Sequence, residues 1–149
     1  MADRPSPREE GLHRELARRI LVFDGAMGTL MQARCREEAD FRGERFRDHP
    51  KDLKGDHEVL NLSQPDVVVA VHREYLVAGA DIIETNTFNA NRISQADYGT
   101  EDLAHEMNVS AARWARQAAD EWMKENPDRE VWVAGALGRP TRPPPCPGT

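Results

Sequence analysis

The 149-residue chain has little cysteine, few aromatic residues and no long hydrophobic run. Its two cysteines, Cys35 and Cys146, lie far apart and suggest no disulfide scaffold, which favours a reducing, cytoplasmic setting. No apolar run approaches the ~18 residues of a membrane span. The polar N-terminus has no apolar segment of the kind that a secretory signal needs. We therefore expect a cytoplasmic protein that makes no use of a membrane.

Positive charge is not in excess either, because the formal net charge is -6. A nucleic-acid partner is therefore not expected, since a phosphate-binding surface needs a basic face. The five histidines show no paired spacing, and with the distant cysteines they assemble no set of about three zinc ligands. His72 is interpreted as a packing residue, and Trp114 and Trp122 as core residues. The sequence thus predicts no metal bound by this chain alone.

Apolar runs and helical periodicities alternate along the middle of the chain. Helices are predicted over 12–19 (with Leu12, Leu16 and Ile20 on one side), from a Ser63 N-cap to a stop at Gly79, and from a Thr100 cap to Asn126–Pro127. Strands are predicted over 20–23, 80–85 and 131–134, the first of them buried on both faces. The alternation of strands and helices predicts right-handed βαβ units and a parallel sheet.

The remaining segments have other compositions. Residues 34–64 are rich in charge and show little periodicity, so we expect a long excursion over the surface with at most a helical turn near Glu37. The last eleven residues, 139–149, contain five prolines and cannot form an interior strand or helix. The chain then divides into an N-terminal extension with a short helix (1–19), an α/β unit (20–138) and a Pro-rich tail (139–149).

Polar and glycine residues follow each predicted strand. They are Asp24, Gly25, Gly28 and Thr29 after the first strand, Thr85, Asn86 and Thr87 after the second, and Gly135 and Gly138 after the third. The carboxyl ends of parallel strands share one edge of a sheet, so these groups predict a small-molecule site there. Asp24 and Asn86 have an alternative interpretation as turn or cap residues.

The glycine-containing segment from Asp24 to Thr29 resembles a phosphate-binding loop. It lacks the lysine of a P-loop, and its glycine spacing is not that of the dinucleotide-binding fingerprint. A cluster of backbone N–H groups that holds a carboxylate suits it equally well.

Several blocks resemble the homocysteine S-methyltransferase family. They are Phe23–Thr29, the stretch from Gln64-Pro65-Asp66 to Thr85-Asn86-Thr87-Phe88, and Gly135–Gly138. The intervening Phe41–Gly43, Leu53–Gly55 and Gln95–Gly99 are similar to the methionine synthase branch in particular. The blocks occur in the family's order and cover about residues 20–138, which makes the resemblance more specific than any one block.

The resemblance implies a (βα)8 barrel that binds homocysteine and a zinc ion, with methylcobalamin as methyl donor, regenerated from methyltetrahydrofolate by further domains. Zinc lowers the thiol pKa so that the thiolate attacks the methyl group. By the same resemblance, Asp24 and the Gly25–Thr29 turn hold the amino-acid head group, and Thr85, Asn86 and Thr87 line that pocket. The family's zinc ligands are cysteines on late strands, in a Gly-Gly-Cys-Cys type of segment that this chain lacks.

We therefore expect the first three βα units of an incomplete TIM-type barrel, truncated and inactive alone, which binds neither zinc nor cobalamin by itself. Open sheet edges predict marginal stability and self-association. Two alternatives are a non-catalytic fragment that associates with a full-length copy, and an unrelated parallel α/β domain that binds a nucleotide or metabolite.

Overall fold

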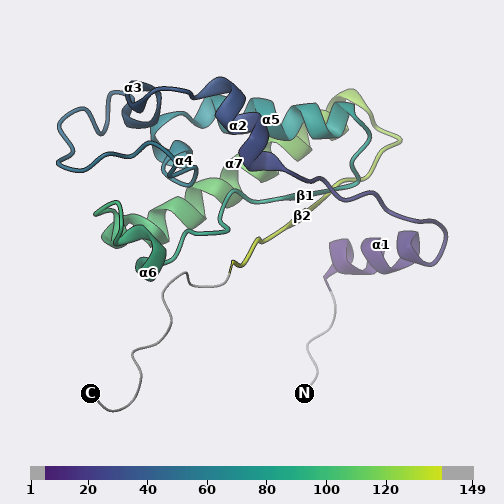
Figure 1. The fold of residues 1–149 in the computed structure, drawn as a ribbon. Helices are drawn as coiled ribbons and strands as arrows, with labels where there is room; N and C mark the ends of the chain where they lie inside the picture. Colours follow the sequence, from purple (N-terminus) through teal and green to yellow (C-terminus); the bar gives the residue numbers. More distant parts are fainter. Residues whose placement is uncertain (1–5, 139–149) are drawn as a thin grey trace, which may run out of the picture.

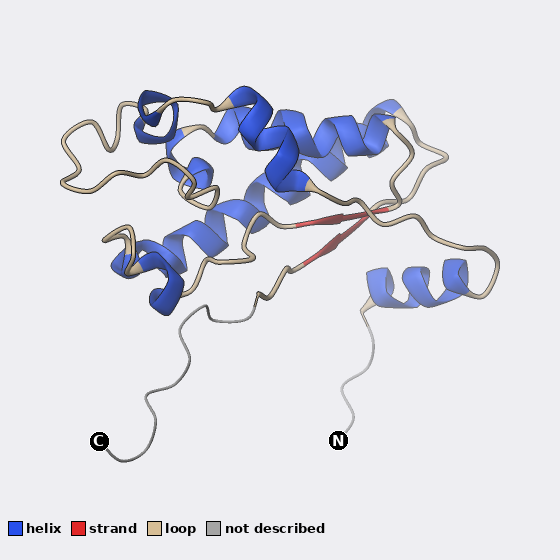
Figure 2. Cartoon of the chain, in the orientation of Figure 1, coloured by secondary structure: helices blue, strands red, loops and turns tan. Residues whose placement is uncertain are grey.

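The computed structural model describes residues 6–138, so the Pro-rich tail and Cys146 lie outside the described residues. Helices dominate this part of the chain, and the strands are short (Figure 2). The elements in order are α1 (Pro7–Leu16), α2 (Met27–Arg34), α3 (Glu38–Arg42), α4 (Leu60–Ser63), α5 (Pro65–Val77), β1 (Ile82–Glu84), α6 (Arg92–Gln95), a short 3₁₀ helix (Glu101–Leu103), α7 (Ala104–Glu125) and β2 (Trp132–Ala134). No helix within residues 6–138 is long and apolar enough to cross a membrane.

The strand segments run parallel, as predicted. β1 pairs with β2 in the register Ile82–Trp132, Ile83–Val133 and Glu84–Ala134. On the other side of β1, Phe23 forms a single parallel bridge with Ile82. The prediction of a strand over 20–23 buried on both faces is wrong, because Ile20 is 89% exposed and Val22 is 53% exposed. This segment contacts the sheet along one edge only, so most of its side chains stay open to solvent.

The helices α5 and α7 cover one face of the strands (Figure 1). Ile83 points to this face and is completely buried against alanines of α7, with Leu76 and Val131 in the same cluster. Side chains alternate along a strand, so Ile82 and Glu84 point to the opposite face. The small alanine side chains allow α7 to approach the strands closely, which fixes the sheet on the helical layer.

The ends of the two long helices depart in detail from the predictions. α5 starts with Pro65 in its first turn and ends before Gly79, whose φ of +105° suits glycine. Gln64 is its N-cap residue, so the predicted Ser63 cap is wrong; the Ser63 hydroxyl donates to the Val59 carbonyl instead. Thr100 is the N-cap residue of the short 3₁₀ helix that leads into α7, so its predicted position is confirmed, but its hydroxyl makes no capping hydrogen bond and donates to Gln95 Oε1 at 2.7 Å instead.

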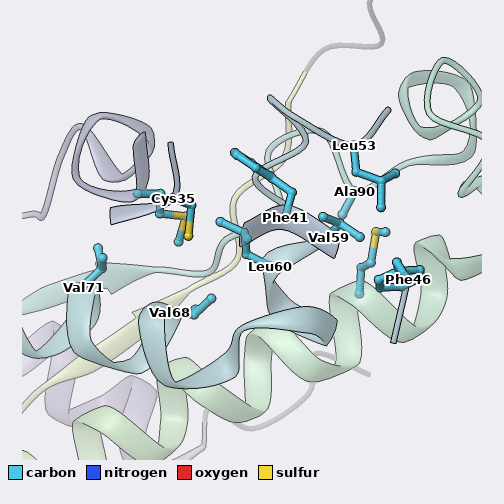
Figure 3. Packing of buried hydrophobic residues seen from close by; sticks show 11 residues of the cluster. Cys35, Phe41, Phe46, Leu53, Val59, Leu60, Val68, Val71 and Ala90 are labelled. Atoms are coloured by element: carbon cyan, nitrogen blue, oxygen red, sulfur yellow. The ribbon is translucent and has the colours of Figure 1, made fainter. Parts of the chain in front are cut away.

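Residues 34–64 form part of the main core rather than a surface excursion (Figure 3). Phe41, Leu53 and Leu60 are at most 2% exposed and pack with Val68 of α5. Their spacing follows neither the helical nor the strand period, because they come from turns and from the short helices α3 and α4. Irregular apolar residues of this kind carry no periodic signal in a sequence.

The N-terminal helix α1 lies on the side of the strands away from α5 and α7 (Figure 1). It begins at Pro7 with a capping box made by Ser6 and Glu9, five residues before the predicted start, and ends at Leu16. The predicted apolar side is wrong, since Leu16 is 53% exposed. The helix is held by Trp132, whose Nε1 donates to the Arg8 carbonyl.

Candidate functional site

A cavity of about 260 Å³ lies where the strand segments end. Its lining comes from the turn after Phe23, the turn before α4, the segment after β1 and the segment after β2. The lining residues are Gly25, Met27, Gly28, His57, Glu58, Glu84, Thr85, Asn86, Thr87, Phe88, Asn89 and Ala136. Of the predicted site residues, Gly25, Gly28, Thr85, Asn86 and Thr87 are thus brought together in one cavity.

The first two residues of α2, Met27 and Gly28, line this cavity. Ala26 is the N-cap residue and has no side chain to accept a hydrogen bond. The N–H groups of Met27 and Gly28 have no acceptor among residues 6–138, as expected for a first helical turn without a cap. Helix N-termini attract anions, so this end of the cavity suits a carboxylate.

Asp24 lies beside the cavity rather than on its wall. Because Phe23 pairs with Ile82, strand alternation puts Asp24 on the same face as Ile83, toward the helices. Its Oδ2 accepts from the Glu84 N–H at 2.9 Å, and its buried Oδ1 has no partner among the described residues. Burial raises the pKa of Asp24 to about 6, with a smaller contribution from the charge of Glu84. Thr29, another predicted site residue, is exposed on α2 and does not line the cavity.

Thr85 and Thr87 join the end of β1 to the segment after β2. Their hydroxyl oxygens lie 2.7 Å apart, Thr87 Oγ1 donates to the Ala136 carbonyl, and the Ala136 N–H donates to Thr85 Oγ1. Both residues are 7% exposed. Their hydroxyl groups are therefore occupied in holding the cavity wall together.

Asn86 fastens the wall to α4. Its Nδ2 donates to the His57 carbonyl at 2.7 Å and to Asn61 Oδ1 at 3.2 Å, while Asn61 Nδ2 donates back to the Asn86 carbonyl at 2.8 Å. The side-chain amide of Asn86 acts here as a clamp between the segment after β1 and residues 57–61.

Three lining residues with ionisable groups were not predicted as site residues from the sequence: His57, Glu58 and Glu84. Burial lowers the pKa of His57, and its Nε2 has no partner among the described residues. Glu58 is 5% exposed and accepts from the Asn89 N–H at 2.8 Å. The Glu84 carboxylate has no hydrogen-bond or ion-pair partner within residues 6–138. The sequence did contain a signal for Glu84, because it alternates with the buried Ile83 along a strand. It contained none for His57 and Glu58, which belong to the irregular 34–64 segment.

The profile of the homocysteine S-methyltransferase family matches residues 21–143. The chain belongs to the homocysteine S-methyltransferase family. Among solved structures, the oxidized form of the homocysteine methyltransferase MmuM from Escherichia coli shares 27% identity at a TM-score of 0.67, covering 85% of this chain and 40% of that one. Its metallated form shares 25% identity at a TM-score of 0.66, covering 85% and 41%. The chain thus spans about two fifths of the length of these homocysteine methyltransferases.

The lining of the cavity in this family member is acidic. Glu58 and Glu84 line it, and no lysine or arginine within residues 6–138 does. A phosphate group would meet two carboxylates without a compensating cation, which disfavours a nucleotide or phosphorylated ligand. A zwitterion suits the wall better, with its ammonium group near the carboxylates and its carboxylate at the α2 N-terminus.

A larger hollow of about 780 Å³ opens at the other end of the strands. Its central polar group is Asp81, which is 2% exposed and accepts from Arg19 at 2.8 and 3.0 Å and from Arg129 at 3.1 Å. These partners, Arg19 foremost, keep the pKa of Asp81 below its usual value. The ion pairs satisfy Asp81 and tie the residues after α1 to the sheet, so this hollow has a structural role.

The described residues do not fit a zinc ion. Within residues 6–138, no three His, Cys, Asp or Glu side chains are placed to hold a metal. Cys35 is 4% exposed in the apolar core, burial raises the pKa of its thiol, and it does not line the cavity at the strand ends. Any zinc that this family member uses has to be held by residues other than these.

Proposed function

We propose that the cavity at the strand ends binds the amino-acid end of homocysteine. The observation that carries this proposal is the pairing of two unsatisfied groups in one cavity: the free N–H groups of Met27 and Gly28, and the unpaired carboxylate of Glu84. The first suits a carboxylate and the second an ammonium group. The small volume of the cavity suits a small amino acid rather than a drug-sized ligand.

Glu84, rather than Asp24, is then the partner of the ammonium group. Asp24 already accepts from the Glu84 N–H and faces the helices, so its role is to hold the backbone of Glu84 in place. Gly25, on the cavity wall, leaves space for the ligand, and Thr85, Asn86 and Thr87 keep the surrounding loops in position. This assignment keeps the predicted pocket and changes which carboxylate contacts the ligand.

We further infer that the chain is the N-terminal part of a (βα)8 barrel of the methionine synthase branch, which transfers a methyl group from methylcobalamin to homocysteine. Two observations support this. The three strand segments are parallel and are separated by α5 and α7. The segment 34–64, whose blocks resemble that branch, supplies His57 and Glu58 to the cavity. Zinc, when bound by residues elsewhere in such a barrel, would activate the thiol; cobalamin would contact other domains.

Calorimetric titration of the 149-residue chain tests the proposal. We expect L-homocysteine and the thiol-free L-homoserine to bind with similar affinity, because the described residues hold only the amino-acid end. 4-Mercaptobutanoate, which lacks the ammonium group, should bind at least tenfold more weakly. The variant Glu84→Gln should weaken L-homoserine binding by roughly 10- to 100-fold, the range expected for one charged hydrogen bond.

Glu10→Gln is the matched control, because Glu10 is exposed on α1 and its carboxylate has no partner among the described residues. It should bind as the unchanged protein does. Equal binding by Glu84→Gln and the unchanged chain would overturn the assignment of the ammonium site. A methylcobalamin assay with added zinc should give no methionine from this chain alone. Formation of methionine would show that the chain has an activity that the described residues do not account for.

A further inference from the structure

Two carboxyl groups meet behind the cavity wall without a cation. Asp56 is 1% exposed and Glu58 is 5% exposed, and the neighbouring Glu58 side chain, through its charge and a hydrogen bond, is among the causes that raise the pKa of Asp56. No lysine or arginine within residues 6–138 forms an ion pair with either. Burying two neighbouring carboxylates in their ionised form is strongly unfavourable, because neither water nor a counter-charge compensates their repulsion.

The surrounding donors leave one oxygen of the pair unsatisfied. Asp56 Oδ1 accepts from the Val59 N–H at 3.3 Å and from Gln95 Nε2 at 3.1 Å. Glu58 Oε1 accepts from the Asn89 N–H at 2.8 Å. Asp56 Oδ2 is buried and has no donor. A proton between the two carboxyl groups would satisfy this oxygen and remove the repulsion at once.

We propose that Asp56 and Glu58 share one proton at neutral pH, that this proton fixes Glu58 in the cavity wall, and that binding of an amino acid's ammonium group releases it. Asp56 is thus a positioning residue that acts through Glu58. The inference rests on the proposed function, because the ammonium group is the cation that takes over the proton's role of balancing the pair.

The position of the pair supports this coupling. Glu58 reaches the cavity directly, while Asp56 connects to α6 through Gln95, whose Oε1 accepts from Thr100. Burial, with Glu58 as a second cause, raises the pKa of Asp56 to about 7. A bound ammonium favours the ionised pair and lowers this pKa, so affinity should rise with pH until the free pair is fully ionised.

Other ionisable groups lie near the pair or the cavity, and the effect of their protonation on affinity has to be distinguished from that of the pair. His57 adjoins Glu58, and burial lowers the pKa of its imidazole. Tyr98 faces both carboxyl groups, and burial and their charges raise the pKa of its hydroxyl. Glu84 also lines the cavity, and Asp24, which accepts from the Glu84 N–H, has a pKa of about 6. Near neutral pH, the competing contributions are those of Asp24 and His57.

Titration calorimetry with L-homoserine between pH 6 and pH 8 tests the coupling in the full 149-residue chain. This ligand avoids the titration of a thiol. The affinity should increase up to about tenfold over this range, the limit for complete release from a group titrating near pH 7. At pH 7, buffers of different ionisation enthalpy should show release of about half a proton per ligand.

The variant Asp56→Asn mimics the protonated partner, because its amide can donate to Glu58. This variant should fold. Its affinity for L-homoserine should change only about twofold between pH 6 and pH 8, which is the change that the titration of Asp24 alone can cause. Persistence of the full pH dependence in Asp56→Asn, and its loss in His57→Gln, would assign the proton to His57 and overturn the inference.

Infrared spectroscopy separates this inference from the proposed function. The free protein at pH 6.5 should show the carbonyl band of a protonated carboxylic acid, and most of that band should vanish in Asp56→Asn. No change in the band on this substitution would refute the shared proton. If the band is present but L-homoserine does not bind at any pH, the ligand-coupled release and the proposed function both fail, while the proton-sharing pair stands.

Discussion

Replacing Asn86 by alanine should remove the clamp between the two loops that form the cavity wall. The substitution deletes the donors to the His57 carbonyl and to Asn61 Oδ1 and leaves both acceptors in a region where Asn61 is only 1% exposed. An unsatisfied buried polar group costs roughly 1–3 kcal/mol. Because water can reach part of this region through the cavity, we expect a loss of about 2–4 kcal/mol in the free energy of unfolding for the two together.

Urea denaturation followed by circular dichroism measures this loss. Thr29→Ala is the control, since Thr29 is exposed on α2, and it should stay within roughly 0.5 kcal/mol of the unchanged protein. A double-mutant cycle with Asn61→Ala should give a coupling energy of about 1 kcal/mol or more. Unfolding of Asn86→Ala at the same urea concentration as the Thr29→Ala control, or energetic independence of the two asparagines, would show that Asn86 does not clamp the wall.

The other predictions concern pH, backbone, metal and association. Because the pKa of Asp56 is raised in the folded state, the folded protein binds more protons than the unfolded chain between about pH 4 and pH 7, so this group's contribution to stability falls as pH rises. Asp56→Asn should therefore gain stability relative to the unchanged protein from pH 5 to pH 8 in parallel melts, and a constant difference would contradict the assignment. Gly43→Ala should lower the free energy of unfolding, measured by urea denaturation, by roughly 1–3 kcal/mol, because Gly43 has φ of +52° and an added Cβ would lie 2.9 Å from the Ser63 carbonyl oxygen. Ala39→Gly is a comparison variant without this strain. Zinc or EDTA should leave the melting temperature unchanged, and a zinc-dependent rise would reveal ligands outside residues 6–138. Phe23→Lys, at a sheet edge where Phe23 is 46% exposed, should reduce self-association in sedimentation experiments, whereas a sharp melt of a monomeric unchanged chain would rule out association through this edge.

Much of the arrangement was determined by the sequence itself. Short apolar runs and period-3.6 patterns are local, so they located α5, α7 and the segments that became β1 and β2, and glycine at position 79 marked the end of a helix. The parallel direction followed from the alternation of strands and helices, and it brought the turn at Gly25 and Gly28 to the same cavity as Thr85 to Thr87.

Only the tertiary structure decided which carboxylates face that cavity. Asp24 and Glu84 both stand at strand ends, yet the register of the Phe23–Ile82 bridge turns Asp24 toward the helices and Glu84 toward the cavity. The burial of 34–64 also depended on long-range packing, since its apolar residues come from turns without a period. His57, Asp56 and Glu58 could not be assigned from the sequence, because their environment is created by α6 and the loop after β1, which lie some 30 to 40 residues further along the chain.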